Sequence, residues 1–194
     1  MKKNQKGFTL IELLAVIVIL AVLLAIAIPA VSKYINTAKK STYKENVQSY
    51  AKAAKTEFAN INSDYQLPVN GGDAVVLTFA DLEYAIENGG KVSSYNGTFN
   101  DTTKDNSCVV VVNDGDANNP HYTYYIAAKD SKNYSIGVGK DCKLMAYDAI
   151  KEDNIIQTSN AGIKCKDVND LHAQVSDITS LYDGKTGNLI GSVQ

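Results

Sequence analysis

The sequence predicts an α+β protein in which a long N-terminal α-helix packs on an antiparallel β-sheet head. Three observations support this prediction. Residues Phe8 to Val31 include 21 apolar side chains in 24 positions. An apolar stripe with helical spacing follows, and the second half of the chain has short segments rich in β-branched and aromatic residues. What remains after the apolar run is enough for one folded domain of common size.

The composition disfavours two classes of function. The 194 residues include 19 basic and 21 acidic side chains, a formal net charge of -2, so no nucleic-acid partner is predicted. Every basic residue is Lys. Without Arg the chain lacks the side chain that normally binds phosphates and carboxylates in a bidentate manner, which disfavours a phosphate-handling enzyme.

The apolar run follows a basic segment, Met1 to Gly7, with three lysines and no acidic residue. About 20 helical residues cross a hydrocarbon core of about 30 Å, so the run at 8–31 can span a bilayer. The lysines place the N-terminus in the cytoplasm by the positive-inside rule, and the bulk of the chain outside. This pattern leaves two alternatives open: a plain signal anchor, and a secretory signal cleaved after the small-residue site Ala25-Ile26-Ala27.

One carboxylate, Glu12, interrupts the apolar run. An acidic side chain in a membrane normally has a partner that neutralises it, and the run contains no Lys or His. Cleavage just before Phe8 would create a partner, because the new α-amino group, with a pKa of about 8, would be largely cationic. That amine could meet Glu12 of its own chain or of a neighbour.

At Lys6-Gly7-Phe8-Thr9-Leu10-Ile11-Glu12-Leu13-Leu14 the sequence resembles the N-terminal motif of the type IV pilin family. The resemblance implies that a prepilin peptidase cuts after Gly7 and that Phe8 becomes the N-methylated first residue of the mature chain. It also implies that Glu12 pairs with the terminal amine of an adjacent subunit during assembly. Pro29 lies where many family members have a helix-bending proline.

A proline within a helical pattern removes one backbone hydrogen bond and bends the helix. The helical pattern continues beyond Pro29, so we predict a kink there and not the end of the helix. The predicted helix runs from Phe8 to about Ile61, a length of about 80 Å. Its second half has apolar residues at spacings of three and four: Tyr43, Val47, Tyr50, Ala54, Phe58 and Ile61.

The chain divides into four predicted parts: a leader peptide at 1–7, a transmembrane and polymerisation helix at 8–31, the amphipathic second half of the helix at 32–62, and a globular head at 63–194. In the head, Thr78 is the expected N-cap of a short helix that ends near Asn88, before Gly89-Gly90. A second helix is expected from about Val168 to Tyr182.

Four strands are predicted to form an antiparallel meander, one face of which buries the apolar stripe of the long helix. A further edge strand is expected at Leu189 to Val193. The four predicted strands are Cys108 to Val112, Tyr122 to Ala128, Tyr134 to Val138, and Cys142 to Tyr147.

All three cysteines lie in the head, outside the membrane, where disulfides can persist. Many pilins close a C-terminal loop with one disulfide, and the resemblance therefore implies a pair between Cys142 and Cys165. A Cys108 to Cys142 pair and three reduced thiols are the alternatives. No metal site is predicted, because the cysteines lack the short spacing typical of zinc ligands.

No catalytic site is predicted, and no cofactor is expected. The two histidines, His121 and His172, are 51 positions apart and lie in a strand start and a predicted helix. Ser41-Thr42-Tyr43-Lys44 has the form of an S-x-x-K motif, but it lies on the long helix without its companion motifs. The sequence therefore predicts a structural protein and not an enzyme.

The resemblance implies a structural subunit of a type IV pilus. Expected partners are further copies of the chain, other pilins, the prepilin peptidase, the pilus assembly machinery and, before assembly, the cytoplasmic membrane. The expected locations are the cytoplasmic membrane, with the N-terminus inside, for the precursor and a cell-surface pilus for the assembled form. Two alternatives remain: a pseudopilin of a type II secretion or DNA-uptake system, and a monomeric membrane-anchored binding protein with an uncleaved anchor.

Overall fold

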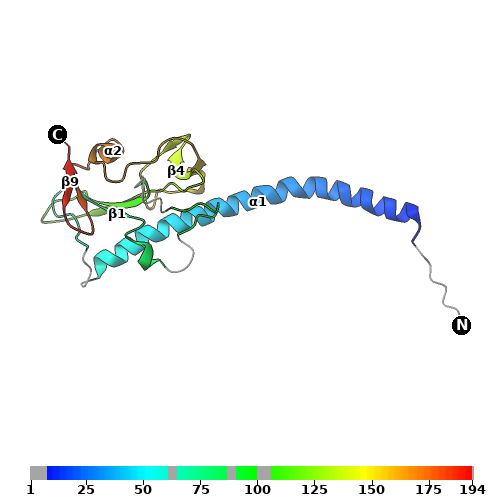
Figure 1. Ribbon diagram of the computed structural model, residues 1–194, viewed down its shortest axis with the longest axis horizontal. Helices are drawn as coiled ribbons and strands as arrows, with labels where there is room; N and C mark the ends of the chain where they lie inside the picture. Colours follow the sequence, from blue (N-terminus) through cyan, green and yellow to red (C-terminus); the bar gives the residue numbers. More distant parts are fainter. Residues whose placement is uncertain (1–7, 61–64, 87–90, 100–105, 194) are drawn as a thin grey trace. The chain divides into compact units, whose positions relative to one another are not determined.

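The computed structural model describes residues 8–60, 65–86, 91–99 and 106–193 and has the α+β fold expected from the sequence (Figure 1). A long helix, α1 (Leu10–Ala59), precedes a region rich in antiparallel strands. The chain forms two compact units, one ending at Ala38 and one beginning at Lys39, and α1 contributes to both. The expected leader at 1–7 and the end of the helix at Ile61 lie outside the described residues.

In the first unit, α1 passes through Pro29 without interruption, so this proline does not end the helix. Just beyond it, the Ser32 hydroxyl donates a hydrogen bond to the Ile28 carbonyl over 2.9 Å. Such bonds to the preceding turn often accompany a bend in a helix. The kink at Pro29 remains a prediction.

In the second unit, one face of α1 is buried as the stripe predicts. Tyr43, Val47, Tyr50 and Ala54 are fully buried, and Phe58 is partly buried against the same cluster. The Tyr50 ring stacks on Phe79 with ring centroids 3.6 Å apart, and the Tyr43 hydroxyl donates to the Tyr134 carbonyl over 2.8 Å. The stripe is therefore the helix side of the main core.

The larger sheet has six strands in the order β6-β3-β2-β1-β8-β9. Neighbouring strands are antiparallel except β1 and β8, which are parallel. The strands are β1 (Asp73–Thr78), β2 (Cys108–Asn113), β3 (Tyr122–Ala127), β6 (Met145–Ala146), β8 (Ser180–Asp183) and β9 (Leu189–Ser192).

The centre of this sheet is buried on both faces, which produces two apolar clusters. In β2, Val109 and Val111 belong to the cluster that includes α1. Val110 and Val112 belong to a second cluster, which is covered by α2 (Val168–His172). In Figure 1, β1 lies along the cyan part of α1, and α2 lies on the opposite side of β1 from α1. Continuous apolar strands such as β2 are therefore explained by burial on both sides.

The smaller sheet has the order β5-β4-β7. Its strands are β5 (Asp141–Cys142), β4 (Tyr134–Val138) and β7 (Ile155–Gln157), and β7 follows a 3₁₀ turn, η2 (Glu152–Asn154). The single strand expected over Cys142 to Tyr147 is wrong. Its first part pairs with β4 and its last part with β3, so the segment crosses from one sheet to the other.

Two helix predictions in the head are also wrong. Thr78 and Asp81 form the expected cap, with the Thr78 hydroxyl 2.6 Å from the Asp81 carboxylate, but only a 3₁₀ turn, η1 (Glu83–Ala85), follows among the described residues. The helix that begins at Val168 ends at His172, and β8 begins at Ser180. The edge strand near the C-terminus is confirmed, because β9 is the last strand of the larger sheet.

The disulfide expected between Cys142 and Cys165 is wrong. The structure joins Cys108 to Cys165, with Cα atoms 6.1 Å apart, and leaves Cys142 as a buried thiol. Cys108 begins β2 in the larger sheet, and its side chain lies in the second cluster together with Cys165. Cys142 also contributes to that cluster, but from β5 of the smaller sheet. The fold of the two sheets therefore decides which pair forms.

Removing this disulfide should destabilise the head strongly. The bond joins residues 57 positions apart, so the chain-entropy model predicts a loss of about 4 kcal/mol in the double variant Cys108→Ala/Cys165→Ala. Urea unfolding of the purified chain, followed by tyrosine fluorescence, measures the loss. Cys142→Ala is the matched control, with an expected loss of about 1 kcal/mol. Equal losses in the two variants would contradict the observed pairing.

Candidate functional site

The N-terminal part of α1 exposes an apolar surface in the single chain. Phe8 is 90% exposed and Leu10 83% exposed, and the other large apolar side chains up to Val31 are exposed as well. Apolar surface in water costs about 25 cal/mol per Å², so this segment requires an apolar environment. By length and composition α1 can cross a membrane. Its first half is therefore suited to a bilayer or to packing among similar helices.

A capping box between Thr9 and Glu12 begins the helix. The Thr9 backbone N–H and the Thr9 hydroxyl each donate to Glu12 Oε2 over 2.8 Å, and the Glu12 N–H donates to the Thr9 hydroxyl over 3.3 Å. This reciprocal arrangement satisfies backbone donors that the first turn of a helix leaves free. The positive end of the helix dipole also favours a carboxylate at this position.

The capping box fixes the position of Glu12 and leaves part of its carboxylate available. Both contacts from Thr9 use Oε2, and within residues 8–60 Oε1 accepts no hydrogen bond. A carboxylate can accept about four hydrogen bonds, so a further cation can bind without displacing Thr9. Glu12 is thus presented at the end of an apolar helix with one oxygen free for a partner outside this turn.

Of the predicted N-terminal site residues, Phe8, Glu12 and Pro29 lie in the first unit, but the structure does not test their roles. Phe8 is the first described residue, Glu12 lies in the first turn of α1, and Gly7 lies outside the described residues. In the uncleaved chain the nitrogen of Phe8 is an amide, so the amine expected to pair with Glu12 is not yet present. Pairing with Glu12 stays a prediction.

Thr9 is the residue of this site that sequence reasoning missed. The spacing Thr9-x-x-Glu12 before an apolar run is a known signature of a helix N-terminus. Glu12 was interpreted only as a charge in need of a cation. The same carboxylate also has a local role, because it caps the first turn of α1.

The histidines occupy structural positions. His121 contacts Asp114 in the turn between β2 and β3, where the Thr123 hydroxyl also donates to Asp114 over 2.9 Å. Although partial desolvation opposes it, these hydrogen bonds lower the pKa of the Asp114 carboxyl. His172 Nδ1 lies 2.7 Å from the Ile178 carbonyl. Among the described residues no group of three or more His, Cys, Asp or Glu side chains is arranged to hold a metal.

Comparison with known proteins finds one family model that matches the N-terminal segment and one curated relative that matches a short part of the chain. Residues 2–28 match the family described as the prokaryotic N-terminal methylation motif. The chain is 46% identical over 55 residues to the competence protein ComGC of Bacillus subtilis (strain 168). That match covers 28% of this chain and 55% of ComGC, so the chain spans about half the length of this relative. No solved structure matches the chain.

Proposed function

We propose that this chain, which belongs to the type IV pilin family by its N-terminal motif, is a structural subunit of a type IV pilus. The chain would enter the cytoplasmic membrane as a prepilin with its N-terminus inside. A prepilin peptidase would cut after Gly7, Phe8 would be N-methylated, and the apolar helix would then polymerise. The main support is the exposed apolar helix that begins with a fixed Glu12 carboxylate.

Cleavage before Phe8 would change the charge at the start of the helix. The leader takes three lysines with it, and the new α-amino group adds one positive charge at Phe8. A carboxylate buried among apolar helices is tolerated when a cation pairs with it and is strongly disfavoured when it is alone. Pairing of Glu12 in one subunit with the Phe8 amine of another would therefore set the register between helices.

Burial of the apolar segment would drive cohesion of the filament. A subunit that leaves the bilayer exposes its apolar side chains unless neighbouring helices cover them. Identical segments from other subunits, or from other pilins, offer the same apolar surface. The segment at 8–31 would thus serve first as a membrane anchor and then as the core of the polymer.

A second candidate function is that of a pseudopilin in a DNA-uptake or type II secretion system. The relative ComGC is a competence protein, and this observation favours the DNA-uptake form. The match is confined to 55 residues, and most of the head lies outside it. Both functions use the same cleavage, methylation and helix polymerisation, so the N-terminal site does not separate them.

Immunogold electron microscopy of whole cells separates the two candidates. With antibodies raised against the purified chain, a pilus subunit should label long surface fibres continuously along their length, because every subunit presents the same head. A strain that lacks the gene for this chain is the control and should show no labelled fibres. Labelled protein restricted to the cell envelope, without long fibres, would contradict the pilus proposal and favour the pseudopilin.

A further inference from the structure

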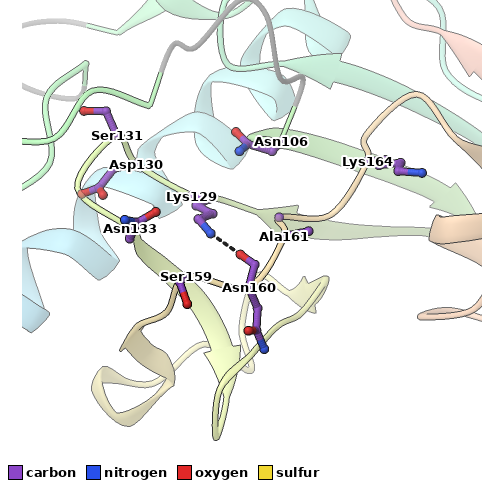
Figure 2. A pocket seen from close by; sticks show the side chains of 10 residues that line it. Asn106, Lys129, Asp130, Ser131, Asn133, Ser159, Asn160, Ala161 and Lys164 are labelled. Carbon is purple, nitrogen blue, oxygen red and sulfur yellow. Dashed lines mark hydrogen bonds between the residues drawn. The ribbon is translucent and has the colours of Figure 1, made fainter.

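The head has a cavity of about 380 Å³ between the end of β3 and the segment that follows β7 (Figure 2). Three parts of the chain line it: Asn106 just before β2, residues 129–133 between β3 and β4, and residues 159–164 after β7. The volume lies within the range of about 300 to 1,000 Å³ that is typical of small-molecule sites. Its walls combine apolar surface with amide, hydroxyl, carboxylate and ammonium groups.

A buried ammonium group reaches into this cavity. Lys129 is only 8% exposed, and its Nζ donates to the backbone carbonyl of Asn160 (Figure 2). Among the described residues no carboxylate lies within 4.0 Å of this nitrogen. An ammonium has three donors, so two N–H groups are left for a ligand. A buried charge is costly unless it is paired, which indicates that an anion completes this site.

The adjacent carboxylate, Asp130, does not meet that need. It is buried, and its Oδ2 accepts a hydrogen bond from the Ser93 hydroxyl over 2.5 Å. Its Oδ1 accepts from the backbone N–H groups of Lys132 and Tyr134 over 2.9 and 2.8 Å. Both oxygens of Asp130 are thus engaged, one by Ser93 and the other by the loop between β3 and β4. Within the described part of the chain, Lys129 therefore has no ionic partner within 4.0 Å.

A second wall of the cavity presents an acceptor without a donor. The side-chain oxygen Oδ1 of Asn106 is buried and has no hydrogen-bond partner among the residues that the structure describes. Gly162 confines this side chain, because a Cβ at position 162 would lie 2.8 Å from the Cβ of Asn106. An unsatisfied buried polar atom costs about 1 to 3 kcal/mol and calls for an explanation. A hydroxyl or N–H of a ligand would satisfy it.

We propose that this cavity binds a small hydroxylated anion of the class of a sugar phosphate or sugar acid. The anionic group would accept hydrogen bonds from Lys129, and a ligand hydroxyl would donate to Asn106 Oδ1. Ser131, Ser159 and Asn133 offer further hydrogen bonds. Lys164 also lines the cavity, but its exposed ammonium lies 3.8 Å from the Asp167 carboxylate and is already paired.

Isothermal titration calorimetry of the full-length chain in detergent micelles tests the proposal, with D-glucose 6-phosphate as the probe. D-glucose and inorganic phosphate are titrated separately, because each offers only one of the two recognised groups. Saturable binding of the sugar phosphate, at least tenfold tighter than either part alone, is expected. Absence of saturable binding, or equal binding of inorganic phosphate alone, would overturn the proposal.

Three variants locate the binding. Asn106→Asp keeps the shape of the side chain and places a carboxylate in the cavity, which should repel the anion and weaken binding at least tenfold. Lys129→Met keeps most of the buried stem, removes the ammonium and should have a similar effect. Lys132→Met is the control, because Lys132 is an exposed lysine of the same loop that does not line the cavity. If Lys129→Met fails to fold, the affinity of Asn106→Asp for the sugar phosphate is the deciding measurement. An affinity of Asn106→Asp equal to that of Lys132→Met would contradict binding in this cavity.

Discussion

Replacing Glu12 by Ala should leave a processed, membrane-inserted protein that forms few or no filaments. The substitution removes the only acidic side chain of the apolar segment at 8–31. Without this carboxylate, the Phe8 amine of a neighbouring subunit would be buried among apolar helices without a partner, which is strongly disfavoured. Shearing filaments from cells and comparing their yield with the amount of cleaved protein in the membrane measures the effect.

Two variants separate the local role of Glu12 from its role between subunits. Thr9→Ala removes the capping box at a cost of about 1 kcal/mol, but keeps the carboxylate, so it should assemble far better than Glu12→Ala. Glu12→Gln keeps the shape and part of the hydrogen bonding without the charge, and should assemble poorly. Normal filament yield from Glu12→Ala, or an equal loss in Thr9→Ala, would contradict pairing between subunits.

Replacing Gly7 by Leu should block maturation and therefore also assembly. In the family that the N-terminal motif resembles, the leader ends in Gly, and a branched side chain at the cleavage position would obstruct the peptidase. The variant should accumulate in the membrane with residues 1–7 still attached, and no filaments should form. Lys6→Gln is the matched control, since it alters the neighbouring residue, keeps Gly7 and should be cleaved.

Intact-mass measurement of membrane fractions distinguishes the cleaved and uncleaved chains directly. A Gly7→Leu variant that still yields a chain beginning at Phe8 would show that the glycine does not determine cleavage. An uncleaved variant that nevertheless assembled would show that the free amine at Phe8 is not required, and would remove the proposed partner of Glu12.

The long helix could be predicted because its signals are long and consistent. The apolar run and the stripe of Tyr43, Val47 and Tyr50 extend over many turns, and their period specifies a helix. Three of the predicted strands, β2, β3 and β4, were recognisable from β-branched and aromatic residues between turns. The N-terminal motif could be recognised for the same reason, because it is contiguous in sequence.

The remaining parts of the head depend on contacts between distant segments. β1 was missed because its last residue, Thr78, has the pattern of a helix N-cap, so the four apolar residues before it were not recognised as a strand. The apolar residues from Val168 onward have helical spacing, although only the first of them lie in a helix. The short helix α2, the turn after it and β8 each contribute apolar side chains to the second cluster. The Cys108–Cys165 pair follows from the position of β2, which no local pattern specifies. The cavity at Lys129 likewise combines three separate segments.

The proposed function is tested most directly by the mass of the N-terminal peptide of the natural chain, isolated from membranes and analysed by tandem mass spectrometry. The peptide is expected to begin at Phe8 and to have one methyl group on its α-amine. The mature chain would then have 16 basic and 21 acidic side chains, with one added positive charge at Phe8. A chain that retains Met1 would indicate an uncleaved anchor, and one that begins after Ala27 would indicate a secretory signal. Either result would contradict the proposed function.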